Sequence, residues 1–207
     1  MRPRSSLRDT RLIYHLNLTG GSCNPAPMGV IPSVENMPSA KFIFPPNFEA
    51  LAKATTFTVR LAISHLQTGW FTNSQNTYMS APVEVNAFGD VIGHSHIVIE
   101  KLSGFGQTTP TDPKNYAFFK ALNDPAVNGV LSTDVTGGLP VGFYRIAAFH
   151  SGSNHQPSEC DNNLQPAQGL TDCRLRLPSW SPRRDARIHG RHGLCEYTAP
   201  RLRRHLV

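Results

Sequence analysis

The 207-residue chain is long enough for one domain with a substantial core, and its 17 Pro and 16 Gly favour a loop-rich β protein over a helical bundle. Its net charge of +6 is uneven: residues 1–12 carry +3, residues 158–207 carry +4, and residues 13–157 carry −1. Because a nucleic-acid-binding surface belongs to the folded part of a protein, this distribution argues against specific nucleic-acid recognition. The chain has no apolar run of roughly 18 residues, so we expect no membrane span.

The first clear element is a strand from Phe57 to Ile63, where apolar residues at odd positions alternate with more polar ones. Val83 to Val85 and Val91 to Lys101 flank a Gly-containing loop at residues 86–90, which predicts a β-hairpin. Residues 130–135 and 143–149 predict two further strands.

One short helix is expected at residues 113–122. Asp112 can cap it, Pro113 suits its first turn, and Tyr116, Phe119 and Leu122 recur at helical spacing. Short strands with a single helix predict a mainly β fold, an antiparallel β-sandwich or barrel.

The segment Gly-His-Ser-His-Ile-Val-Ile-Glu at residues 93–100 combines strand patterning with metal-ligand chemistry. In a strand, His94, His96 and Glu100 share one face, whereas Ile97 and Ile99 point to the other. Two imidazoles at i and i+2 stand roughly 6.6 Å apart along a strand, which allows convergence on one zinc or copper ion. Glu100 lies farther along and needs a bulge or sharp coil to reach the same ion. The plain alternative is a half-buried strand with a polar outer face.

Two other histidines, His155 and His150, are candidates to complete a metal shell. The structural alternative for His155 is a hydrogen bond within a turn, and for His150 it is the role of a satisfied polar neighbour at a strand end.

The spacing of His94, His96 and Glu100 is similar to the first motif of the cupins, and residues 140–144 are similar to part of the second. Arg145 stands where that second motif would place a histidine, so a four-ligand cupin site is not complete. No Gly-x-Ser-x-Gly segment is present, and whether the chain is an enzyme stays open.

The chain changes character after Pro157. Residues 158–207 contain nine Arg, no Lys and three of the four Cys, and no Cys-x-x-Cys pair occurs in the chain. We expect an irregular Arg-rich tail that stays outside the core, with no specific site formed by its cysteines. The domain plan is therefore an atypical extension at 1–21, a β domain at 22–157 and the tail at 158–207.

Several motifs in this plan resemble a family of secreted fungal proteins without an established biochemical activity. They include Gly-His-Ser-His-x-Val-x-Glu at 93–100, Thr-Thr-Pro-Thr-Asp-Pro at 108–113 and Asn-His-Gln-Pro at 154–157. Some members of that family carry a ribosomal-protein label, which the charge distribution does not support. The resemblance implies an extracellular protein, whereas residues 1–20 lack the continuous apolar segment of a signal peptide.

The resemblance also implies a closing segment with a further strand and histidine, which this chain does not show. Codons permitted for residues 182–195, read one nucleotide later, include a close copy of that segment. We therefore expect residues 158–179 to derive from a retained intron that shifts the reading frame; the alternative is a genuine tail that has diverged from the family. Sequencing the transcript across the Pro157 codon tests this.

Two function classes follow from these observations. The first is a non-catalytic extracellular or cell-surface domain with a partner at a cell wall or host surface. The second is a metal-binding protein or cupin-like metalloenzyme that uses the His94, His96 and Glu100 face, with His155 as a further ligand.

Overall fold

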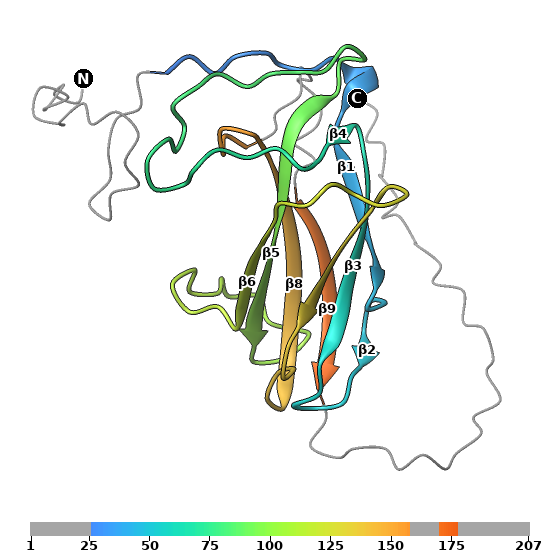
Figure 1. Ribbon diagram of the computed structural model, residues 1–207. Coiled ribbons are helices and arrows are strands. Elements are labelled where there is room, and N and C mark those ends of the chain that lie inside the picture. Colours follow the sequence, from blue (N-terminus) through green and yellow to red (C-terminus); the bar gives the residue numbers. More distant parts are fainter. Residues whose placement is uncertain (1–25, 158–169, 178–207) are drawn as a thin grey trace, which may run out of the picture.

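A computed structural model describes residues 26–157 and 170–177 (Figure 1). The elements in chain order are the 3-10 helix η1 (Val34–Asn36) and the strands β1 (Ser39–Phe44), β2 (Glu49–Ala50), β3 (Phe57–Ser64), β4 (Leu66–Gln67), β5 (Val91–Leu102), β6 (Phe118–Leu122), β7 (Val130–Val135), β8 (Gly142–Gly152) and β9 (Leu170–Leu177).

The strands form two sheets that pack as a β-sandwich. The smaller sheet has the order β1-β3-β7 and is antiparallel. The larger sheet has the order β2-β9-β8-β5-β4, and β6 also pairs with β5. Its long strands are antiparallel, whereas the two-residue strands β2 and β4 pair in parallel with β9 and β5. The expected antiparallel sandwich is therefore confirmed, and the sheets do not close into a barrel.

The core lies between the two sheets and is built by the alternation in their strands. Val59 and Leu61 of β3 are fully buried and face Ile97 and Ile99 of β5, which are also fully buried. Burying one such side chain contributes roughly 1.5–3 kcal/mol. The inner face of β5 is thus fixed by packing, and its outer face carries the polar residues.

Four of the strands expected from alternation are confirmed: β3, β5, β7 and β8 cover the predicted segments. The expected hairpin is confirmed at its base, where Val85 and Val91 form an antiparallel bridge and the Asn86 N–H donates to the Asp90 carbonyl at 2.8 Å. Val83 forms a parallel bridge with Gly29 in place of a regular strand.

The helix expected at residues 113–122 is wrong. The Asp112 carboxylate accepts hydrogen bonds from the Lys114 backbone at 3.0 Å and the Asn115 amide at 2.6 Å, but the turn that it caps does not continue. Residues 118–122 instead form β6 on the edge of β5. Pairing with an existing strand and the strand preference of two adjacent phenylalanines outweigh the local helical spacing.

The tail prediction is also wrong for residues 170–177. They form β9, which pairs with β8 over eight residue pairs and thereby becomes an interior strand of the larger sheet. Leu175 and Leu177 are 0% and 1% exposed and belong to the core. These two leucines alternate with the exposed Arg176. Burial of their side chains offsets the conformational entropy that the segment loses when it is ordered as a strand.

The remaining tail predictions, and the extension at residues 1–21, lie outside the described residues. In the part of the chain that is described, no helix has the length and hydropathy needed to cross a membrane.

Candidate metal centre

The outer face of β5 carries His94 and His96. Because strand residues alternate between faces, these two imidazoles project away from Ile97 and Ile99, which lie in the core. Both histidines are buried, with 0% and 7% of their surface exposed. The prediction that the two histidines share one face is therefore confirmed.

A tight turn after β8 brings His155 to the same place. The Gly152 N–H donates to the Gln156 carbonyl at 2.8 Å, and the His155 N–H donates to the Gly152 carbonyl at 3.0 Å. The fully buried Asn154 joins this turn to the β4–β5 loop through its backbone carbonyl, which accepts from Met79 at 2.8 Å. His155 has a φ of 72°, a left-handed conformation that histidine adopts more readily than most residues. The turn thus directs its imidazole over β5.

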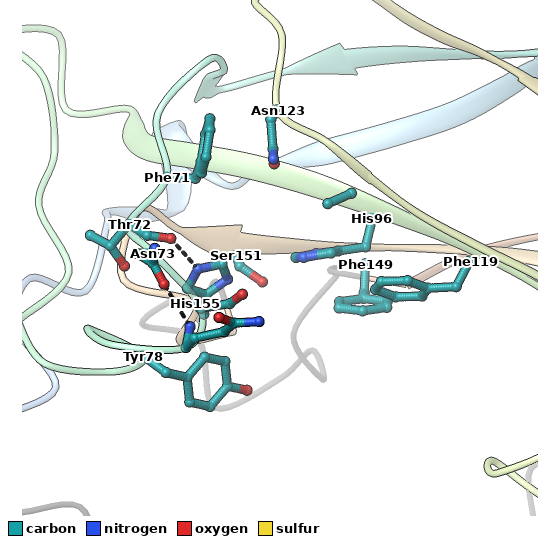
Figure 2. A pocket seen from close by; sticks show the side chains of 13 residues that line it. Phe71, Thr72, Asn73, Tyr78, His96, Phe119, Asn123, Phe149, Ser151 and His155 are labelled. Carbon is teal, nitrogen blue, oxygen red and sulfur yellow. Dashed lines mark hydrogen bonds between the residues drawn. The ribbon is translucent and has the colours of Figure 1, made fainter. Parts of the chain in front are cut away.

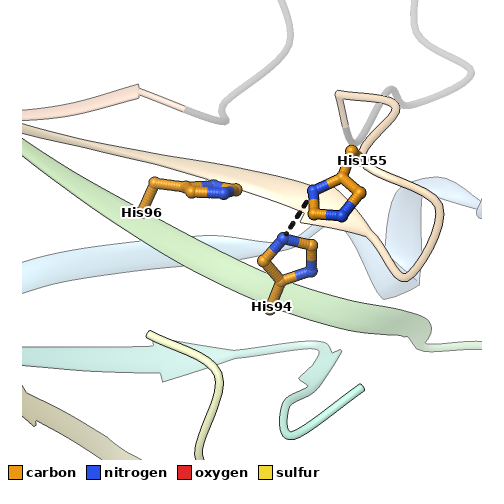
Figure 3. A group of neighbouring side chains, drawn as sticks. All are labelled: His94, His96 and His155. Atoms are coloured by element: carbon orange, nitrogen blue, oxygen red, sulfur yellow. Dashed lines mark hydrogen bonds between the residues drawn. The ribbon is translucent and has the colours of Figure 1, made fainter. Parts of the chain in front are cut away.

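The three imidazoles form a compact group, hereafter the histidine cluster: His94, His96 and His155 (Figure 3). One nitrogen from each ring lies within 4.8 Å of the others. The ring centroids of His94 and His96 are 4.6 Å apart, and those of His94 and His155 are also 4.6 Å apart. The cluster joins two parts of the chain, since His94 and His155 are 61 residues apart in the sequence.

Two backbone carbonyls of the β4–β5 loop fix the protonated nitrogens of the cluster. Nδ1 of His94 lies 3.2 Å from the Trp70 carbonyl oxygen, and Nε2 of His155 lies 2.8 Å from the Thr72 carbonyl oxygen. A carbonyl oxygen only accepts hydrogen bonds, so each of these nitrogens must donate its N–H. In a neutral imidazole the second nitrogen is then a bare acceptor.

Those two bare nitrogens face each other. Nε2 of His94 and Nδ1 of His155 are 3.1 Å apart (Figure 3). The two contacts to carbonyls and this contact between nitrogens each require one N–H hydrogen. Two neutral imidazoles supply only two such hydrogens. A proton or a metal cation between the two nitrogens would resolve this conflict.

His96 adds a third ring with an unused nitrogen. Its imidazole stacks on Phe149 with ring centroids 4.5 Å apart and on Phe119 with centroids 5.8 Å apart. Nδ1 of His96 is buried and has no hydrogen-bond partner among the described residues. An unpaired buried nitrogen costs about 1–3 kcal/mol, so Nδ1 does not fix this ring, which is held in position by packing against the two phenylalanines.

Burial keeps His94 and His96 uncharged. Burial, and then the charge of His155, lowers the pKa of His94 to about 4. Burial, and then the charges of His94 and His155, lowers the pKa of His96 to about 3. Both rings are therefore neutral at pH 7, which is the form that binds metals.

The cluster opens into a pocket of about 510 Å³ between the larger sheet and the β4–β5 loop (Figure 2). His96 and His155 line it, whereas His94 lies beneath. Its walls are aromatic, with Phe119 and Phe149 on the sheet and Tyr78 on the loop. None of the described residues that line the pocket is an acid, a lysine or an arginine.

Comparison with known proteins shows the family of this chain. Residues 40–163 match the model of the CLU5d N-terminal domain family. The chain belongs to this family. It is 44% identical over 143 residues to the pathogenicity cluster 5 protein d of Colletotrichum graminicola. That alignment covers 67% of the chain and 30% of the relative, so the chain spans under a third of that protein. The expected fungal family is confirmed.

The histidine cluster and the β4–β5 loop both lie inside the range that matches the CLU5d domain. The three histidines therefore lie in the part of the chain that matches the family's domain.

Glu100, the other predicted ligand on this face, is not brought into the cluster. It lies opposite Arg145 on β8, whose Nε donates to its carboxylate at 3.1 Å. The Thr111 hydroxyl also donates to the carboxylate, at 2.6 Å. Arg145 stands where the cupin resemblance would require a histidine, and in this CLU5d domain it is the ion-pair partner of the buried Glu100.

His150, the alternative third ligand, points to the other side of the sheet. It is the cross-strand partner of Ser95, and Ser95 Oγ lies 3.0 Å from His150 Nδ1. Because residues 95 and 96 face opposite sides of β5, His150 cannot join the histidine cluster. Its other nitrogen, Nε2, is buried and has no hydrogen-bond partner in the part of the chain that the structure describes.

We expect His150 to make the CLU5d domain sensitive to acid. Burial lowers the pKa of His150 from 6.5 to about 4, so the unfolded chain binds a proton that the folded chain excludes. The stability that depends on a neutral His150 is fully present above pH 6.5 and is lost as the pH falls toward 4. The loss amounts to roughly 3 kcal/mol of unfolding free energy.

Replacement His150→Leu isolates this effect, because Ser95 can still donate to the Phe149 carbonyl, 3.3 Å away. Urea unfolding of metal-free protein at pH 7 and pH 4 should show a smaller loss in the variant, by roughly 3 kcal/mol. Equal losses in both proteins would contradict the assignment.

Sequence reasoning missed the pocket. Phe119 was assigned to a helix, and Phe149 was seen only as part of a strand. The register that sets Phe149 opposite His96 depends on the pairing of β5 with β8, which no local pattern encodes.

Proposed function

We propose that this domain binds one divalent transition-metal ion, zinc or copper, through His94, His96 and His155. The observation that carries the proposal is the 3.1 Å contact between Nε2 of His94 and Nδ1 of His155. The N–H of each neutral ring is already donated to a backbone carbonyl, so neither ring has a hydrogen left for this contact. Two nitrogens bound to one zinc ion at about 2.0–2.1 Å in tetrahedral geometry lie roughly 3.3 Å apart. A small outward movement of either ring would therefore accommodate an ion.

The surroundings of the cluster also suit a metal. Metal-bound imidazoles commonly donate their second N–H to a carbonyl, which is what His94 and His155 do toward Trp70 and Thr72. Imidazole ligands favour zinc and copper over calcium or magnesium. Three such ligands leave one coordination position open, and the pocket lies on the side of His96 and His155.

An extracellular place of action is part of the proposal. It is supported by the resemblance to secreted fungal proteins and by the name of the Colletotrichum relative, which refers to pathogenicity. A cell wall or host surface would then be the setting in which the domain meets its partner.

Calorimetric titration of zinc and copper into the metal-free full chain tests the ligand set. We expect one tight site per chain in the wild type and a loss of affinity of more than about hundredfold in His155→Asn and in His96→Phe. Asn tolerates the left-handed backbone of position 155, and Phe can keep the stacking of position 96 between Phe119 and Phe149.

Two control variants sharpen the result. His65→Ala removes an exposed imidazole outside the cluster, and Glu100→Gln removes the carboxylate of the other predicted ligand. Both should bind metal as the wild type does. Tight binding that survives His155→Asn, or that is lost in Glu100→Gln while the fold is retained, would contradict the proposed ligands.

A further inference from the structure

The chemistry of the pocket points to the kind of molecule that would meet the metal. This inference rests on the proposed metal site and specifies what occupies its open position. Three neutral imidazoles leave the double positive charge of the ion uncompensated, and none of the described residues lining the pocket is an acid. An anionic fourth ligand would compensate this charge and is favoured over a neutral one, because buried charge is costly without a partner.

The walls of the pocket select a flat apolar body. Phe71, Phe119 and Phe149 are 51%, 46% and 36% exposed, and these large apolar side chains gather around one cavity together with Tyr78. Figure 2 shows Tyr78 on the loop side and the two sheet phenylalanines across the pocket. Aromatic rings pack favourably on such side chains, in stacked or edge-on geometry.

One polar atom in the wall has no partner within the described chain. The side-chain oxygen of Asn123 is buried and makes no hydrogen bond there, although Asn123 lines the pocket. A buried acceptor without a donor is costly, so a ligand hydroxyl that reaches it would be favoured.

We propose that the pocket binds a small aromatic carboxylate, with the carboxylate on the metal of the histidine cluster and the ring between the aromatic walls. A ring hydroxyl that donates to Asn123 completes the match. The volume of about 510 Å³ is within the range of small-molecule sites, and a single substituted ring fits it.

The test uses 4-hydroxybenzoate as the probe. Acetate, which lacks the aromatic ring, and phenol, which lacks the carboxylate, are the matched controls. Calorimetry on the zinc-loaded full chain should show 4-hydroxybenzoate binding at least about tenfold more tightly than acetate or phenol. Zinc-free protein should lose at least about tenfold in affinity for 4-hydroxybenzoate.

The variant Phe119→Leu should weaken 4-hydroxybenzoate by at least about threefold and leave acetate unchanged, because Phe119 is a half-exposed wall residue. Its zinc affinity, measured on the same samples, serves as the control for the metal site.

The outcomes separate the two proposals. If zinc binds but 4-hydroxybenzoate is no tighter than acetate, the aromatic specificity is overturned and the metal site stands. If 4-hydroxybenzoate binds equally well without zinc, the carboxylate–metal contact is overturned. If zinc does not bind, both proposals fail together.

Discussion

Zinc in large excess should raise the thermal unfolding midpoint of the metal-free full chain by roughly 8–16 °C. At a free zinc concentration about a thousand times the dissociation constant, binding to the folded state alone adds roughly 4 kcal/mol of stability. For a chain of this size, each kcal/mol shifts the midpoint by about 2–4 °C. The stabilisation is specific to the fold because His94 and His96 on β5 meet His155 only after β8 has paired with β5.

Differential scanning calorimetry with and without zinc measures the shift, and a chelator should reverse it. The matched variant is His155→Asn, which should unfold near the wild-type midpoint without zinc and show little change when zinc is added. A zinc-dependent rise of equal size in His155→Asn would place the stabilising ion elsewhere.

Replacement of Leu175 by Ala should lower the free energy of unfolding by about 2–5 kcal/mol. Leu175 is fully buried on β9, where it contacts the core between the sheets. Removing its branched side chain loses the transfer free energy of the missing carbons and leaves a cavity that the sheets fill only in part. Urea unfolding at pH 7 measures the change.

Arg176→Ala is the matched control on the same strand. The Arg176 guanidinium lies 5.8 Å from the centre of the Phe143 ring and is otherwise exposed, so its loss should cost no more than about 1 kcal/mol. A loss below about 1 kcal/mol for Leu175→Ala would show that β9 contributes little to the folded core.

Strands with clear alternation could be predicted from the sequence, because their period follows from the two faces of a sandwich. Val59 and Leu61 are an example, since their fully buried positions match the odd-numbered pattern of β3. β6 could not be predicted, because Tyr116, Phe119 and Leu122 fit a helical spacing and only the pairing with β5 decides against it. β9 carries a local alternation of Leu175 and Leu177 with arginines, which the unusual composition of its surroundings concealed.

The candidate site also has features that could be predicted from the sequence and features that could not. That His94 and His96 share a face follows from residue parity along one strand. The position of Glu100 outside the cluster could not be predicted from parity, because its ion-pair partner Arg145 is known only from the register of β5 against β8. His155 was one of two possible third ligands, and the turn that contains it settles which of them meets the pair.

The carbonyls that orient His94 and His155 belong to the main chain of Trp70 and Thr72. Every amino acid carries the same carbonyl, so mutation can change the side chains at these two positions without removing either acceptor. The side chains of the loop can therefore vary: Trp70, with 54% of its surface exposed, can be exchanged while the imidazoles beneath keep their orientation. A fixed orientation of the imidazoles and an exchangeable set of exposed side chains can in this way depend on the same few residues of the chain.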